Sequence, residues 1–291
     1  MPELPEVETT VRDLKRKVLG RTFLNVWCDA KKLIKRPRTF EEFKKEILGR
    51  KIISIKRKGK NILIYLDKKK ALLIHQKLTG HLLVGKWQKK GNSWIPQIKG
   101  PLEDPINRFI HLIFFLDNDL MLALSDLRKF AKVELWDKKE LTQSKEIREI
   151  GIDPFSPEFT FQEFKKRIKN TKRKIKQVLM DQSLIAGIGN IYSDEILFEA
   201  KIHPEKKAHV LKEEELKRIY QSIKKVLKKA IELGGESISD YRRPDGSKGG
   251  FDPLRKVYRR EGKPCVRCRT PIKRIKIAQR SSYFCPKCQK L

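Results

Sequence analysis

The chain has 291 residues, of which 68 are lysine or arginine and 36 are aspartate or glutamate, giving a formal net charge of +32. A chain longer than about 250 residues predicts two or three domains rather than a single core. The basic excess indicates a polyanionic partner, most often nucleic acid, although it does not separate an enzyme from a ribosomal or packaging protein. A signal-peptide core and any run of about 18 apolar residues are lacking, so we expect a cytoplasmic protein that does not enter a membrane.

The first eight residues suit covalent chemistry. Removal of Met1 would leave Pro2 as the terminal residue, and a terminal secondary amine attacks electrophilic carbon to form an iminium. Its pKa near ~8, against ~10.4 for a lysine, leaves more of it unprotonated at neutral pH. Glu3 and Glu6 are candidate proton donors or orienting groups. The alternative is structural, with Pro5 starting a helix whose positive end the glutamates stabilise.

Apolar periodicity predicts one helix followed by a β-rich region. The helix should end at Gly20, since apolar residues recur at intervals of four, three and four at Val7, Val11, Leu14 and Val18. Short apolar segments then predict a sandwich or barrel. Its strands are expected at Ile52–Ile55, Asn61–Leu66, Ala71–His75, Phe109–Leu116, Met121–Ser125 and Lys132–Trp136. Lys86–Pro105 is expected to be a long surface loop.

A helical region is predicted after a connection at Asp137–Pro157. Thr160 and Glu163 have the spacing of a capping box at the start of a short helix. Longer apolar periodicity predicts further helices at Lys172–Met180, Ile191–Ala200 and Lys212–Leu233. A polar loop, Ser237–Asp252, then precedes the cysteine-rich tail.

Four of the five cysteines lie in two pairs, Cys265-x-x-Cys268 and Cys285-x-x-Cys288, separated by sixteen residues. This is the spacing of a tetrahedral four-thiolate zinc site, with iron or unbound thiols as alternatives. A closed ligand set leaves no open coordination position, so we expect one structural zinc ion per chain. The tail from residue 262 has nine lysines and arginines and no acidic residue, which predicts phosphate contacts.

Other motifs have both a functional and a structural interpretation. Asn190 ends a Gly-Ile-Gly-Asn segment that opens a helix, where free N–H groups bind anions or glycines merely allow close packing. Lys60 follows Lys58-Gly59 before a strand, where most lysines are solvated. Arg128 and Phe130 form either a wedge between stacked bases or the rim of a barrel. His75 is either a core residue or a ligand.

Together these motifs resemble those of the bacterial formamidopyrimidine-DNA glycosylase family, whose members repair 8-oxoguanine and which is related to endonuclease VIII. The resemblance covers nearly the whole chain and rests on five motifs in the family's order. These are Pro2–Glu8, Lys58–Lys60, Leu179–Asp181 with Gly187–Tyr192, Ile202–Pro204, and Cys265–Cys288 with Ala278–Arg280. Leu4 favours the formamidopyrimidine branch, and Asp245–Phe251 resembles its lesion-covering loop.

The resemblance implies an α+β fold in which an N-terminal helix lies on a β-sandwich and is followed by a helix–two-turn–helix domain and a zinc ribbon. The expected segments are the catalytic domain 1–136, a linker 137–155, the helical domain 156–236, the lesion-covering region 237–260 and the ribbon 261–291.

The implied activity is base excision repair of duplex DNA. The enzyme would remove oxidised purines, 8-oxoguanine and formamidopyrimidines, and would nick the backbone by β,δ-elimination as an apurinic/apyrimidinic lyase. The implied catalytic residues are the Schiff-base nucleophile Pro2, the acid Glu3, and Lys60 and Arg280 on phosphates. The implied DNA contacts are His75, Leu78, Arg108, Arg128, Phe130, Lys172 and Asn190. Damaged double-stranded DNA would be the partner of a monomeric protein, and no protein partner is implied.

Three positions depart from the family's pattern. Leu78 replaces the methionine of His-Leu-Gly-Met-Thr-Gly, and the segment Asp126–Phe130 lacks the usual proline. Phe109 stands where a histidine is usual, with Arg108 as a substitute for the lost phosphate contact. An endonuclease VIII-like preference for oxidised pyrimidines and a non-catalytic lesion-binding protein are the alternative functions. Pro2 and Glu3 disfavour the second alternative, since a binding protein needs neither.

Overall fold

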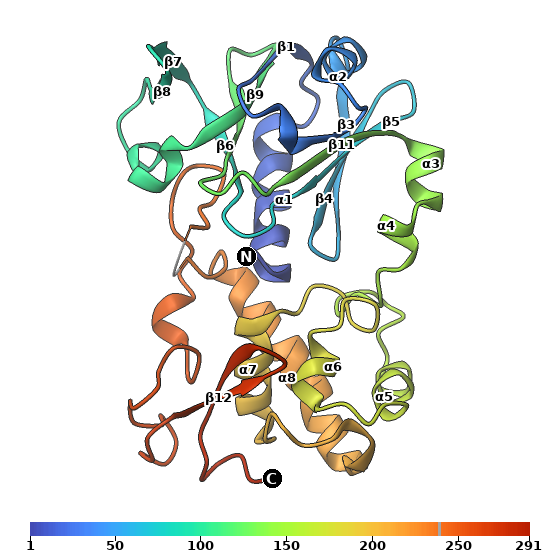
Figure 1. Ribbon diagram of the computed structural model, residues 1–291, viewed down its shortest axis with the longest axis vertical. Coiled ribbons are helices and arrows are strands. Elements are labelled where there is room, and N and C mark those ends of the chain that lie inside the picture. Colours follow the sequence, from blue (N-terminus) through green and yellow to red (C-terminus); the bar gives the residue numbers. More distant parts are fainter. Residues whose placement is uncertain (238–239) are drawn as a thin grey trace. The chain divides into compact units, whose positions relative to one another are not determined.

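The computed structural model describes residues 1–237 and 240–291, and the chain forms two compact units (Figure 1). Unit 1 comprises Met1–Arg148 and Leu233–Asp252, and unit 2 comprises Glu149–Glu232 and Pro253–Leu291. The loop that follows the longest helix therefore belongs to the unit of the N-terminal residues. Within the described ranges, every helix is too short or too polar to cross a membrane.

Unit 1 is a sandwich of two sheets, with strand orders β1-β9-β10-β6 and β2-β11-β5-β4-β3. Every pair is antiparallel except β2 with β11. The strands are β1 (Phe23–Cys28), β2 (Ile34–Arg36), β3 (Ile52–Lys58), β4 (Asn61–Leu66), β5 (Lys70–His75), β6 (His81–Gly85), β9 (Ile110–Leu116), β10 (Met121–Ser125) and β11 (Lys132–Asp137). All six predicted strands are present, with small changes at their ends.

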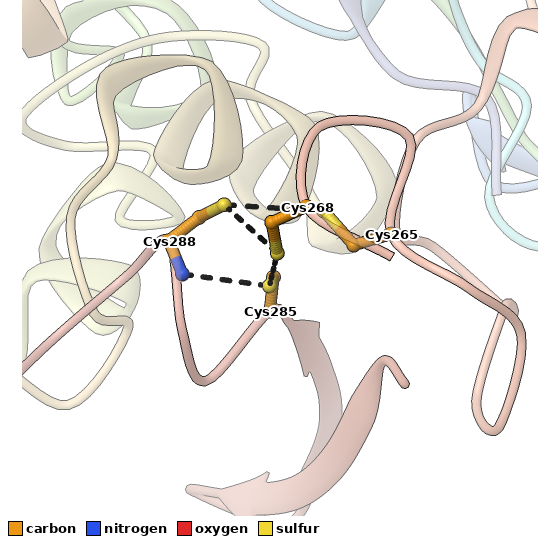
Figure 2. A group of neighbouring side chains, drawn as sticks. All are labelled: Cys265, Cys268, Cys285 and Cys288. Atoms are coloured by element: carbon orange, nitrogen blue, oxygen red, sulfur yellow. Dashed lines mark hydrogen bonds between the residues drawn. The ribbon is translucent and has the colours of Figure 1, made fainter. Parts of the chain in front are cut away.

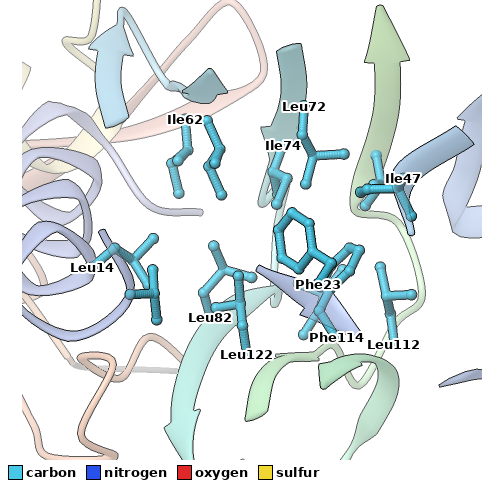
Figure 3. Packing of buried hydrophobic residues seen from close by; sticks show 14 of the residues in the cluster. Leu14, Phe23, Ile47, Ile62, Leu72, Ile74, Leu82, Leu112, Phe114 and Leu122 are labelled. Atoms are coloured by element: carbon cyan, nitrogen blue, oxygen red, sulfur yellow. The ribbon is translucent and has the colours of Figure 1, made fainter. Parts of the chain in front are cut away.

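Helix α1 (Leu4–Val18) confirms the predicted N-terminal helix, because its four periodic apolar residues are each at most 2% exposed. They join the side chains of both sheets in one core (Figure 3), where the ring centroids of Phe23 and Phe114 lie 5.0 Å apart. This packing holds the start of α1 at one end of the sandwich and fixes the position of the residues before it.

Several elements of unit 1 were not predicted. Helix α2 (Phe40–Ile47) begins where the Thr39 side chain accepts a hydrogen bond from the N–H of Glu42. The segment predicted as a long loop, Lys86–Pro105, contains the hairpin β7 (Trp87–Lys90) and β8 (Ser93–Pro96) and the 3-10 helix η2 (Pro101–Glu103), and a second 3-10 helix, η3 (Pro105–Arg108), begins at its last residue. Trp94 packs edge-on against Trp27 of β1, which fastens the hairpin to the sheet. Helices α3 (Lys138–Gln143) and α4 (Lys145–Arg148) occupy the predicted connection.

Unit 2 contains α5 (Phe161–Lys169), α6 (Ile175–Leu179), α7 (Asn190–Ala200), α8 (Glu213–Glu232) and the ribbon strands β12 (Lys273–Ile277) and β13 (Arg280–Phe284). Helix α7 packs between α8 and β13. Helix α6 is shorter than predicted, since Lys174 before it forms a bridge with Lys207. Thr160 caps α5 as predicted, but the Glu163 carboxylate binds Arg167, so the reciprocal half of the capping box is absent. The predicted α+β fold class is confirmed.

Candidate active site and DNA-binding surface

Two glutamates organise the residues before α1. Glu3 and Glu6 are each only 2% exposed. The Glu3 N–H donates to Glu6 Oε2 (2.7 Å), and the Glu236 N–H donates to Glu6 Oε1 (2.8 Å). One carboxylate therefore joins the start of α1 to a segment 230 residues away. The bond between Glu6 and the Glu3 N–H completes a capping box at the start of α1, so it is compatible with both the structural and the orienting interpretation of these glutamates.

The charges around the terminal amine favour its neutral form only in part. Burial lowers the pKa of the Met1 amine, Glu3 and Glu6 act in the opposite direction, and Lys60 lowers the pKa further. Lys60 is 7% exposed, so it is not the solvated lysine that its sequence position favours. It lies in the two-residue turn between β3 and β4, where Gly59 at φ +57° takes the first position of a tight hairpin turn.

His75 is electrically neutral at physiological pH. Burial and the nearby cations Lys77, Lys60 and Lys132 lower the pKa of His75 to about 3. Its Nδ1 accepts a hydrogen bond from the Lys77 N–H at 2.9 Å. A neutral ring with an occupied Nδ1 has only Nε2–H left for a phosphate oxygen.

The turn after β10 presents the predicted wedge residues. The Asp126 carboxylate is fully buried and accepts hydrogen bonds from Thr79 Oγ1 and from the backbone of Arg128, Phe130 and Ala131. Phe130 is 49% exposed, and the Arg128 guanidinium lies 4.7 Å from its ring centroid. These hydrogen bonds to Asp126 restrict the conformation of the turn, as the proline that is missing here would do.

Two further expected contacts lie on nearby turns of unit 1. Leu78 is half-buried in the turn between β5 and β6 and is not a member of the sandwich core. Arg108 is exposed, and its guanidinium stacks 5.0 Å from the ring of Phe109. The arginine therefore presents its charge at the position where the family's histidine is absent.

The expected phosphate contacts of unit 2 lie at helix and strand ends. Lys172 is exposed before α6, and Asn190 is the first residue of α7. The Asn190 Oδ1 is buried without a hydrogen-bond partner. Arg280 is exposed and follows the tight turn Ala278–Gln279, whose residues both have positive φ. It lines a pocket of about 290 Å³ together with Arg173, Lys176, Gln177, Met180, Asp181, Ile277 and Ala278.

Four sulfur atoms come together in the tail (Figure 2), where those of Cys265, Cys268, Cys285 and Cys288 all lie within 4.8 Å of one another. A tetrahedron with Zn–S bonds of about 2.3 Å has edges of about 3.8 Å, so a zinc ion fits. Burial and the neighbouring thiols Cys268 and Cys285 raise the pKa of Cys288 to about 12, whereas hydrogen bonds from Thr270 lower the pKa of Cys268 to about 6. The ligands predicted for one structural zinc ion are confirmed.

Helix α7 holds the ribbon through carboxylates that the sequence did not single out. Asp194 accepts from Lys176 Nζ (2.7 Å), from Ser282 Oγ (2.8 Å) and from the Tyr283 N–H (3.0 Å). Glu195 accepts the three consecutive N–H groups of residues 256–258. The available sequence signal was two adjacent acids among the apolar residues of the predicted helix, and the structure leaves them only 1% and 2% exposed.

Comparison with known proteins gives one consistent answer. Residues 1–133 match the formamidopyrimidine-DNA glycosylase N-terminal domain, residues 150–242 its H2TH domain, and residues 262–291 the zinc finger found in FPG and IleRS. The chain is 40% identical to a formamidopyrimidine-DNA glycosylase of Carboxydothermus hydrogenoformans and 38% identical to one of Pelotomaculum thermopropionicum, with 100% of each chain covered.

Solved structures agree with the sequence comparison. A complex of a Lactococcus lactis FPG mutant with a Fapy-dG containing DNA is 33% identical, with a TM-score of 0.87 and 100% of both chains covered. The MutM (FPG) protein of Thermus thermophilus is 34% identical, with a TM-score of 0.83, over 99% of this chain and 98% of that one. The chain belongs to the formamidopyrimidine-DNA glycosylase family.

Proposed function

We propose that the protein is a bifunctional DNA glycosylase that removes oxidised purines from duplex DNA and then cleaves the backbone as an apurinic/apyrimidinic lyase. The observation that carries this proposal is that Pro2 and Glu3 are both buried at the start of α1, in the unit that also holds the buried Lys60. Relatives of this chain have been solved with Fapy-dG containing DNA and with an abasic site. A terminal secondary amine has a lower pKa than a lysine, so a larger fraction of it is unprotonated and nucleophilic near neutral pH.

After removal of Met1, the Pro2 nitrogen attacks C1′ of the flipped nucleotide, and the base leaves with the electrons of its bond to C1′ and takes up the proton that the Pro2 nitrogen loses. Proton donation by Glu3 to O4′ opens the sugar ring and leaves an iminium between Pro2 and C1′. Loss of a C2′ proton then expels the 3′ phosphate, and a second elimination expels the 5′ phosphate. Lys60 and Arg280 hold these phosphates, and hydrolysis of the iminium frees the amine.

Residues at turns and at the ends of helices and strands of the two units supply the proposed DNA contacts. Arg128 and Phe130 fill the gap left by the flipped nucleotide, together with Leu78, because extrusion costs a few kcal/mol that inserted side chains offset. Phosphate contacts come from His75, Arg108, Lys172 and Asn190. The zinc ion, when bound, keeps the ribbon folded and so keeps Arg280 in place.

The organisation proposed for the chain is that of a monomer in the cytoplasm whose partner is damaged duplex DNA. The proposed segments are 1–136, 137–155, 156–236, 237–260 and 261–291, and limited proteolysis tests these boundaries. Ile238 and Ser239 of the proposed lesion-covering region lie outside the described residues. Size-exclusion chromatography tests the monomer.

Borohydride trapping tests the activity and the substrate together. A duplex with 8-oxoguanine should give a covalent complex, and mass spectrometry should place the DNA on Pro2. A crosslink on Lys60 would contradict the proline mechanism. A thymine glycol duplex belongs in the same experiment, since a wild-type Lactococcus lactis relative was solved with an oxidised pyrimidine containing DNA. Faster trapping on thymine glycol would favour the pyrimidine-directed alternative.

A further inference from the structure

The loop that follows α8 closes on itself at its base. The Gly250 N–H donates to Leu233 O (2.7 Å), and the Phe251 N–H donates to Gly235 O (3.1 Å). The Gly249 backbone approaches so closely that an added Cβ would lie 2.3 Å from Gly235 O. The two ends of the loop are therefore held together, and contacts with other parts of unit 1 determine where its tip lies.

The tip is a compact turn fastened to α1 and β6. The Arg243 N–H donates to Ser247 O (2.9 Å), and the Arg243 guanidinium binds both carboxylate oxygens of Asp13 on α1 (3.0 and 3.2 Å). The Val84 N–H at the edge of β6 donates to Pro244 O (2.7 Å). These contacts fix the turn from two sides.

A third set of contacts comes from residues 101–107, of which the sequence predicted 101–105 as the end of a surface loop. Asp104 Oδ2 accepts from Arg242 Nε (2.9 Å), and Arg242 is 4% exposed. Asn107 Nδ2 lies within hydrogen-bond distance of Gly246 O (3.3 Å) and Pro101 O (2.9 Å). At Gly246, which has φ +86°, an added Cβ would lie 2.7 Å from backbone atoms of residues 101 and 102.

The same loop touches the residues that organise the terminal amine. Tyr241 Oη donates to the carbonyl oxygen of Glu6 (3.1 Å), and the Glu236 N–H donates to the Glu6 carboxylate, which also accepts the N–H of Glu3. The bond from Glu236 to the Glu6 carboxylate lies at the base of the loop, which the bonds of Gly250 and Phe251 hold together without residues 101–107. Segment 101–107, the loop tip and α1 are joined by one connected set of buried and partly buried polar contacts.

We propose that residues 101–107 are a brace that holds the loop Tyr241–Ser247 in place for recognition of the damaged base, with Asp104 and Asn107 as positioning residues. This inference rests on the proposed function, because it requires that the loop contacts the damaged base rather than the sugar–phosphate backbone of the DNA. Opening of the abasic sugar needs the amine and Glu3 but no base contact. Loss of the brace should therefore affect base release more than lyase activity.

The test compares Asp104→Asn with wild type on two duplexes, one with 8-oxoguanine and one with a preformed abasic site. The amide keeps an oxygen for the Ile106 N–H but loses the charge that binds Arg242. We expect kcat/KM for base release to fall about tenfold, which lies within the range found for coupled polar contacts. The kcat/KM for abasic cleavage should fall less than about twofold. Asn107→Asp keeps an acceptor for His81 and should give the same pattern. Glu41→Gln is the matched control, because it breaks an exposed ion pair with Lys31 elsewhere in unit 1.

Hydrogen exchange of residues 241–247 gives a readout that does not depend on catalysis. Exchange should accelerate in Asp104→Asn and stay unchanged in Glu41→Gln. Equal slowing on the two duplexes, or unchanged exchange in the loop, would overturn the brace. Wild-type protein that acts on neither duplex would instead refute the proposed function, and the exchange measurement would still decide whether the brace exists.

Discussion

The start of α1 and the zinc ribbon are held by the same device, a buried carboxylate that accepts backbone N–H groups. At the amino end Glu6 joins Glu3 to Glu236, beside an amine whose pKa burial lowers and beside Lys60. At the carboxyl end Glu195 accepts three N–H groups from the chain entering the ribbon.

The two carboxylates differ in what surrounds them. Glu6 also binds backbone amides, but the terminal amine and the Glu3 carboxyl group beside it gain or lose protons in the proposed reaction, so Glu6 positions reacting groups as well as backbone. The partners of Glu195 are backbone amides, whose charge state does not change. The comparison teaches that a satisfied buried acid marks an important position without telling whether that position is reactive. Whether the position is reactive depends on whether the groups around the acid take part in the reaction.

The largest expected effect is loss of the ribbon. Cys268→Ser removes one of four thiolates, and because structural zinc binding is coupled to local folding, tight DNA binding should fall by more than about a hundredfold. Fluorescence anisotropy with a lesion duplex and metal analysis measure the effect. Cys28→Ser is the control, since Cys28 lies in β1, outside the metal cluster. Tight binding by a zinc-free protein would contradict the prediction.

Glu195→Leu should cost about 3 kcal/mol or more of stability, because three N–H groups would lose their acceptor at a buried position. Burial raises the pKa of Glu195 while these three bonds oppose the rise, so the native carboxylate depends on them. Urea unfolding measures the cost. Trapping by the fraction that remains folded should be nearly normal. A specific loss of trapping with unchanged stability would show that Glu195 is not merely structural.

Glu6→Gln should have the opposite effect, slowing trapping more than it lowers the free energy of unfolding. The amide keeps the shape and one acceptor but turns an NH2 group toward one of two N–H donors, so borohydride trapping should slow about tenfold with a stability loss of about 1 kcal/mol. Glu8→Gln is the matched control on the same helix, where the carboxylate binds Arg12 and Arg57. Equal trapping rates for Glu6→Gln and Glu8→Gln would contradict the prediction that Glu6, unlike Glu195, positions reacting groups.

The sequence predicted the elements whose signals are local. Periodicity gave α1, apolar segments gave six strands, and cysteine spacing gave the zinc ligands. The sequence did not show the contact of Glu6 with Glu236, because 230 residues separate the partners and nothing local marks the pair. The acids of α7 were missed for the same reason, since their partners lie in β13 and in residues 256–258. Arg128 and Lys60 were recognised through a resemblance, whereas their burial and stacking required the folded chain.

Gln76 offers the smallest effect and a contrast with both acids. It is 1% exposed, and neither its Oε1 nor its Nε2 has a hydrogen-bond partner. It follows β5, next to His75, where the family's segment has leucine. A buried polar group without a partner costs about 1–3 kcal/mol, so Gln76→Leu should raise the free energy of unfolding by about 1 kcal/mol. Leucine has a similar volume, which limits strain from the exchange.

The matched control for Gln76 is Trp94→Phe. It removes a buried indole N–H that also lacks a partner, in the β8 strand of the hairpin near β1. Thermal melts of the two variants compare a buried polar group near the proposed wedge residues with one in the separate β7–β8 hairpin. If Gln76→Leu lowers stability while Trp94→Phe raises it, the Gln76 amide is satisfied by bound water in solution. It would then resemble Glu6 and Glu195 in holding its surroundings together rather than differing from them.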